Sequence, residues 1–153
     1  MSYVNKVLQP GEVILGQTRL HWFIYLRPLL LMLVAFAIFA ASDAVTPDMQ
    51  PFFWIGAAVL GVFALLHLFS SWIRRASTEL AVTDRRVIHK TGFFSRRTQE
   101  MNREKVESVD VRQSFAGRIF GYGTVLVRGV GSSWEPFDNI ADPLTFRSNI
   151  TAA

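Results

Sequence analysis

The sequence contains no cysteine in its 153 residues, which excludes a disulfide framework, a thiolate metal site and a cysteine nucleophile. Charged residues are also scarce, at 18% against the roughly 25% that is typical of soluble domains. The formal net charge of +4 is too small for a dedicated nucleic-acid binder, so we expect no nucleic-acid partner. Hydrophobic residues make up 50% of the chain, and this excludes an intrinsically disordered or fibrous protein.

Two long runs hold most of these apolar residues. The first covers residues 22–41 with Arg27 as its only charge, and the second covers residues 52–73 with His67 as its only ionisable side chain. An α-helix rises ~1.5 Å per residue, so about 20 residues cross the hydrocarbon core of a bilayer. The sequence therefore predicts a transmembrane hairpin over residues 20–75, with helices at about 20–41 and 52–73.

The distribution of arginine predicts which way this hairpin faces. Residues 42–51 contain two prolines, two aspartates and no basic residue, whereas Arg19, Arg74 and Arg75 flank the other ends of the helices. The positive-inside rule then places both chain termini in the cytoplasm. A cleaved signal peptide over residues 27–41 is the alternative, but the long, strand-like segment before it does not fit an n-region.

After Arg75 the apolar period shortens to two. Alternating β-branched and polar residues recur around Leu80, around Val109 and through residues 124–130, with glycine-rich or polar turns between them. This pattern is typical of a small antiparallel β barrel or sandwich, which we assign to residues 76–153.

Two further segments complete the predicted domain. Asp142 and Pro143 supply an N-cap and a first-turn proline, so residues 143–151 should form a short helix whose Phe146 and Ile150 pack on the barrel. A domain of 78 residues buries little surface by itself. We therefore expect the N-terminal segment, residues 1–19, to contribute a strand at 12–19 that pairs with the barrel.

The chain resembles bacterial membrane proteins that carry a pleckstrin-homology-like (PH-like) domain of the second bacterial type. The resemblance implies a membrane α+β fold, in which a two-helix hairpin accompanies a bent antiparallel sheet closed by a helix, and a place in the bacterial inner membrane. It implies no defined activity. It is carried by segments in the same order as in the family: LQPGE at 8–12, LAVTDRRVI at 80–88, TGFF at 91–94, VESV at 106–109, GYGTV at 121–125 and IADP at 140–143.

We find no pattern of catalytic residues. His21, His67 and His89 lack metal-ligand spacing, and nucleophile elbows, phosphate loops and dinucleotide fingerprints are missing from the sequence. A haem held by His21 and His67 is disfavoured, because their depths in the hairpin differ by ~7–9 Å at ~1.5 Å per residue. We expect a protein that is not an enzyme, with no catalytic residue, metal or cofactor.

Paired arginines are the best candidates for contact with a membrane surface. One interpretation is that Arg74 and Arg75 set the topology of the hairpin and that the remaining arginines lie on solvated faces of the domain. The other is that a tethered domain lays one basic rim on anionic headgroups, each cation contributing ~1 kcal/mol. The residues in question are Arg74, Arg75, Arg85, Arg86, Arg96 and Arg97.

Arg27 and His67 should lie at a similar depth, ~8–10 Å below the cytoplasmic boundary at ~1.5 Å per residue. Arg27 either snorkels to phosphates beside a neutral His67, or the two side chains bound a polar pocket for a lipid headgroup, a ligand or a partner helix. Small residues predict where helices pack closely, within the hairpin or in an oligomer. These are Ala37, Ala41, Ala57, Gly61 and Ala64.

Two classes of function remain. The first is a membrane-anchored interaction module that displays its domain to a protein partner or to a second copy of itself. The second is a lipid-responsive protein that senses or handles anionic lipid through the basic rim and the Arg27–His67 level.

Overall fold

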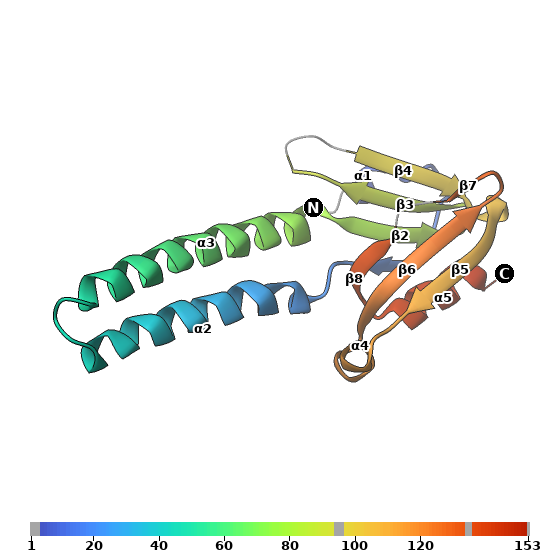
Figure 1. The fold of residues 1–153 in the computed structure, drawn as a ribbon. Helices are drawn as coiled ribbons and strands as arrows, with labels where there is room; N and C mark the ends of the chain where they lie inside the picture. Colours follow the sequence, from blue (N-terminus) through green and yellow to red (C-terminus); the bar gives the residue numbers. More distant parts are fainter. Residues whose placement is uncertain (1–3, 94–96, 134–135, 153) are drawn as a thin grey trace. The chain divides into compact units, whose positions relative to one another are not determined.

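A computed structural model describes residues 4–93, 97–133 and 136–152. The chain divides into two compact units, which we describe separately. The helical hairpin is Trp22–Ile73, and the barrel unit combines Met1–His21 with Arg74–Ala153. Figure 1 shows the elements of both units along the chain.

The hairpin consists of two long apolar helices. A short 3-10 helix, η1 (Trp22–Tyr25), leads into α2 (Leu26–Ala41), and a second one, η2 (Ser42–Ala44), ends that span. The returning helix, α3 (Gln50–Ser77), has 28 residues, of which the last four belong to the barrel unit. Both spans are long and apolar enough to cross a bilayer, which indicates membrane association.

The barrel unit contains two four-stranded antiparallel sheets. The first has the order β1 (Ile14–Thr18), β2 (Glu79–Thr83), β3 (Arg86–Thr91), β4 (Arg97–Asn102). The second is built on β6 (Tyr122–Gly129), which pairs with β5 (Val106–Arg112), β7 (Ser132–Ser133) and β8 (Phe137–Ala141). A bridge between Leu20 and Ile140, with the Ala141 N–H donating to the Arg19 carbonyl at 3.0 Å, joins β1 to β8. The two sheets therefore curve into one barrel.

Among the described residues, four short helices belong to the barrel unit. They are α1 (Val4–Val7), η3 (Arg103–Lys105), α4 (Phe115–Phe120) and α5 (Pro143–Thr151). The predicted C-terminal helix is confirmed: Asp142 caps it, and Phe146 and Ile150 are buried. The helix α4 was not predicted, because its six residues are too few to show a period.

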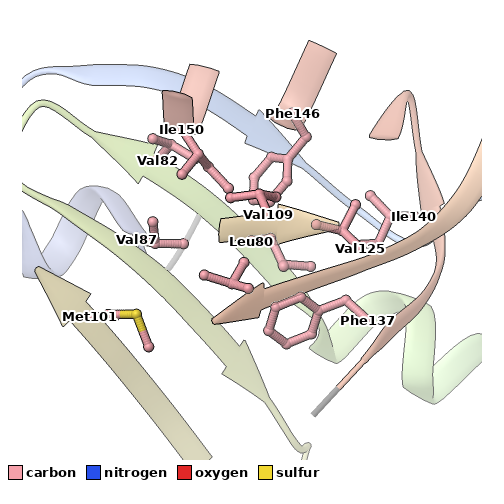
Figure 2. Packing of buried hydrophobic residues seen from close by; sticks show 11 residues of the cluster. Leu80, Val82, Val87, Met101, Val109, Val125, Phe137, Ile140, Phe146 and Ile150 are labelled. Atoms are coloured by element: carbon pink, nitrogen blue, oxygen red, sulfur yellow. The ribbon is translucent and has the colours of Figure 1, made fainter. Parts of the chain in front are cut away.

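The core lies between the sheets and under α5 (Figure 2). Leu80, Val82 and Val87 from the first sheet meet Val125 and Ile140 from the second. Phe146 and Ile150 reach in from α5. Gly16 permits this packing, because a Cβ at its position would overlap the side chain of Asn149 on α5. Two apolar helices, two antiparallel sheets and a C-terminal helix together give the PH-like α+β fold expected from the sequence.

The hairpin is inserted between two neighbouring strands. β1 and β2 pair directly, with Thr18 opposite Leu80, and the whole hairpin occupies the connection between them. We call the end of the barrel where the chain leaves after His21 and returns at Arg74 the stem end. Register places Lys90 beside Glu79 at this end, whereas Thr83 lies at the opposite, distal end.

Candidate functional site

The stem end is held mainly through backbone atoms. The Arg75 side chain donates from Nε to the Leu20 carbonyl at 3.1 Å, and the His21 N–H donates to the Asn139 carbonyl at 2.6 Å. The His21 ring stacks on Tyr122, with 5.6 Å between the ring centroids. Burial, and then the charge of Arg75, lower the pKa of His21 below its ordinary value. The two chain segments that lead to the hairpin are thus fixed to each other and to the second sheet.

The structure does not gather the paired arginines into the single basic rim that was one of the two interpretations of the sequence. Arg74, Arg75 and Arg97 lie at the stem end, because Arg97 pairs with Thr91 at the end of β3. Arg85 and Arg86 lie at the distal end, one β-strand length away. Arg96 lies outside the described residues. Candidate membrane-binding residues must therefore be chosen by their position in the barrel, because Arg74 and Arg75 lie at one end of β2 and Arg85 and Arg86 at the other.

Charge is distributed unequally between the two ends. Basic residues outnumber acidic ones at the strand ends and connections of the stem end. The basic residues are Arg19, Arg74, Arg75, Lys90, Arg97, Arg112 and Arg118, and the acidic ones are Glu79, Asp138 and Asp142. The distal end is nearly balanced, with Glu12, Asp84, Glu100, Glu104 and Glu107 against Arg85, Arg86, Arg103 and Lys105. The excess of positive charge therefore lies at the end of the barrel that is joined to the hairpin.

A buried ion pair fastens the N-terminal segment at the distal end. Arg86 donates to both carboxylate oxygens of Glu12, at 2.9 and 2.8 Å, and a third nitrogen donates to Glu100 at 2.7 Å. The Glu12 side chain is fully buried, and that of Arg86 is 14% exposed. Thr83 and the Gln9 N–H also donate to Glu12, at 2.7 and 2.8 Å. Arg86 is therefore engaged inside the protein, and we withdraw it from the membrane-binding set.

The same contacts explain the acidity of Glu12. The hydrogen bonds from Arg86 hold the pKa of the Glu12 carboxyl at about 2, well below its ordinary value of 4.5, although burial alone would raise it. The sequence analysis missed this pair, although both residues stand in the segments that carry the family resemblance. Glu12 and Arg86 are 74 residues apart, and only the pairing of β1 with β2 brings them together.

A cavity of about 830 Å³ opens at the distal end, beside this ion pair. The start of β3, the end of β4, the start of β5 and the end of α5 surround it. Arg103 donates from Nε to the Ile150 carbonyl at 2.9 Å, while its Nη2 is buried without a hydrogen-bond partner among the described residues. Glu104 and Glu107 are exposed at the opening. The cavity offers donors and acceptors side by side, which suits a dipolar ligand or a peptide segment.

Within the described residues, no group of three histidine, cysteine or acidic side chains converges as a metal site.

The hairpin has a cavity of its own. Arg27 and His67 both line a space of about 450 Å³, together with apolar side chains of α2 and α3. Nδ1 of His67 is buried and has no hydrogen-bond partner in the part of the chain that the structure describes. Arg27 is exposed in the hairpin. The structure thus places the two predicted residues at one level and leaves a buried nitrogen there that a polar ligand atom can satisfy.

The helices of the hairpin bury small residues at heptad spacing. In α2 and just after it these are Pro28, Ala35 and Ser42, each seven residues from the next. In α3 they are Ala57, Ala64 and Ser71. Repetition every seven residues is typical of helices packed at a shallow left-handed angle. Trp54 donates from Nε1 to Ser42 at 3.0 Å near the connecting loop.

Within the hairpin, this seam differs in α2 from the set of small residues predicted to pack closely. Ala57 and Ala64 are buried as expected, but Ala37 and Ala41 are exposed. A Cβ added at Gly61 would meet no atom within 4 Å, so that glycine serves no close approach within the hairpin. The small size of a residue was not enough to predict which face of α2 is buried. The seven-residue spacing of Pro28, Ala35 and Ser42 identifies that face.

The sequence model of the family described as Bacterial PH domain matches residues 23–152. The match starts in the hairpin and ends just after α5, so it includes most of both units. No curated protein matches the chain, and no solved structure matches it.

Proposed function

Because the chain belongs to the bacterial PH domain family, we propose that it is a non-enzymatic, membrane-anchored interaction module. The hairpin spans the inner membrane, and the barrel is displayed in the cytoplasm to a protein partner or to a second copy. The observation that carries this proposal is the insertion of two helices of membrane-spanning length between β1 and β2. A domain tethered through both strands of a pair keeps its stem end toward the membrane.

Arginine supports the same orientation. Arg74 and Arg75 lie in the last turn of α3, directly after its apolar run, and the loop between the spans has no basic residue. The positive-inside rule then favours cytoplasmic termini and a cytoplasmic barrel. The distal cavity lies at the end of the barrel opposite its two connections to the hairpin, so the tether leaves it accessible to a partner.

Site-specific photo-cross-linking tests this role. A photoreactive residue in place of Glu104, at the distal cavity, should give a discrete cross-linked product in native membranes. The same residue in place of Asp138, exposed on β8, should not. Adding Glu107→Lys to the protein with the photoreactive residue at position 104 should abolish the product. Cross-linking of equal strength from both positions, or none from Glu104, would contradict a distal partner site.

A lipid-responsive role is the second candidate, and the Arg27–His67 cavity is the observation that favours it. A lipid phosphate in this cavity would meet the Arg27 guanidinium and accept from a protonated or suitably tautomeric His67. Native mass spectrometry of gently purified protein should then show anionic lipid that Arg27→Leu and His67→Phe both lose. The control is Val59→Leu, at an exposed position of α3 away from the cavity lining. Equal lipid retention in all four proteins rejects this candidate.

A further inference from the structure

The helix α4 at the stem end carries an apolar surface that no role above uses. It connects β5 to β6, and both of its ends are fixed. The Ser114 hydroxyl accepts from the Gly117 N–H at 3.0 Å, and Gly121 closes the helix in the left-handed conformation, with φ of 75°. The N-cap side chain and the C-terminal glycine define both ends of this six-residue helix, so α4 is a regular part of the fold.

The side chains of α4 point outward to an unusual degree. Phe115 is 81% exposed, Ile119 is 64% exposed and Phe120 is 48% exposed. The inner face is a glycine: a Cβ at Gly117 would lie 2.5 Å from the Tyr122 carbonyl oxygen. Because Gly117 brings the helix backbone against β6, the large side chains cannot share that inner face. Phe115 and Ile119 are four residues apart and therefore lie on the same side of the helix.

The position of α4 in the barrel unit indicates what covers this surface. Tyr122, which follows its C-cap, stacks on His21, the last residue before the hairpin. The Gly121 carbonyl accepts from the Asp142 N–H at 2.9 Å, which fixes the helix end to the chain leading into α5. Exposed basic residues, Arg112 and Arg118, flank the apolar group. The apolar tip thus belongs to the end of the barrel that the hairpin tethers.

We propose that α4 inserts Phe115, Ile119 and Phe120 into the headgroup–acyl boundary of the membrane that the hairpin spans. The proposal rests on the membrane anchoring proposed above. Aromatic and aliphatic side chains bordered by arginine are the composition of interfacial anchors. The excess of basic residues at the stem end complements anionic headgroups, and the tether supplies a high local concentration of bilayer. The barrel is then held at three points, namely two chain crossings and α4, which fixes its tilt as well as its distance.

The absence of cysteine from this chain permits a direct test with the hairpin and the barrel together. Single cysteines replace Phe115 or Ile119, each labelled with an environment-sensitive fluorophore and reconstituted in vesicles of phosphatidylcholine and phosphatidylglycerol. Val130, 67% exposed beyond the distal end of β6, is the matched apolar control. Lipids with a nitroxide near the headgroup should quench the two α4 labels several-fold more strongly than the Val130 label, and the α4 emission should shift to the blue.

A third label separates this inference from the anchoring on which it rests. A fluorophore at Val59, exposed in the middle of α3, should be quenched by a nitroxide deep in the acyl chains. Quenching at Val59 with α4 labels no more quenched than Val130 overturns the insertion of α4 and leaves the anchored hairpin intact. No quenching at Val59 overturns the anchoring itself. Because Phe115 and Ile119 are both largely exposed, neither substitution removes a core contact.

Discussion

The two ends of the barrel are made from the same strands but are stabilised in different ways. At the stem end the contacts run largely through backbone carbonyls and N–H groups, and Arg74, Arg97, Arg112 and Arg118 are exposed. At the distal end side chains bond to one another, as Arg86 does with Glu12 and Glu100. Arginines in similar sequence contexts therefore have different roles, which depend on whether the folded chain engages their charge. A cation neutralised inside the fold stabilises it, whereas an exposed cation is available to a surface.

The largest expected effect is at the distal end. Replacing Glu12 with Gln leaves the Arg86 guanidinium facing an uncharged buried amide, and breaking a buried ion pair costs about 3–5 kcal/mol. Amide hydrogen exchange of β2 and β3 should accelerate at least a hundredfold, at about 1.4 kcal/mol per tenfold. The control is Asp110→Asn, which breaks the exposed pair of Asp110 with Arg128 and should change exchange by less than about fivefold. Equal effects would show that the Glu12–Arg86 pair is no stronger than a surface pair.

Acid should remove the same stabilisation. The pKa of Glu12 is about 2 in the folded protein against an ordinary value of 4.5, so its contribution is complete above about pH 5 and disappears as the pH falls through about 2. The lowered pKa corresponds to ~3 kcal/mol. In denaturant titrations the difference between the wild type and Glu12→Gln should narrow steadily across this range. A difference that stays constant from pH 6 to pH 2 would contradict the role of the carboxylate charge.

The stem end should respond more weakly to a comparable change. Arg75→Ala removes one hydrogen bond from a charged donor to the Leu20 carbonyl, worth about 1.5–3 kcal/mol at most. It also removes the positive charge that lowers the pKa of His21, so that pKa should rise, while burial still holds it below the ordinary value. Histidine chemical shifts followed against pH measure this change. Arg74→Ala is the neighbouring control and should leave the His21 pKa where it is.

Exposed charges should affect lipid binding and leave folding almost unchanged. Arg118→Glu at the stem end and Arg85→Glu at the distal end are the same substitution at opposite ends. Each stem-end cation near an anionic surface is worth about 1 kcal/mol, so Arg118→Glu should reduce nitroxide quenching at Ile119 in anionic vesicles. Arg85→Glu should not. A decrease in both variants would mean that the barrel has no preferred end toward the bilayer.

Much of the architecture was predictable because its signals are local. The hairpin follows from the apolar runs, and α5 from Asp142, Pro143 and the pair Phe146 and Ile150. The alternation of apolar residues indicated an antiparallel β domain. Boundaries were less accurate: α3 continues to Ser77, since the helix does not stop where its hydrophobic run ends at Ile73.

The candidate sites were harder to predict because they depend on pairing across the chain. Arg85 and Arg86 resemble Arg74 and Arg75 in sequence, but a five-residue strand separates them in the barrel. The Glu12–Arg86 pair and the distal cavity require the register of both sheets. In α4, the exposure of Phe115 follows from the close approach of Gly117 to β6, which no local pattern reports.

Cysteine accessibility in intact cells tests most directly whether the hairpin crosses the membrane and holds the barrel in the cytoplasm. Thr46 lies in the loop between the two spans and Glu107 at the distal end of the barrel, and both are exposed. With single cysteines at these positions, a membrane-impermeant thiol reagent should label position 46 in intact cells and position 107 only after the membrane is permeabilised. Labelling of position 107 in intact cells, or protection of position 46, would contradict the account.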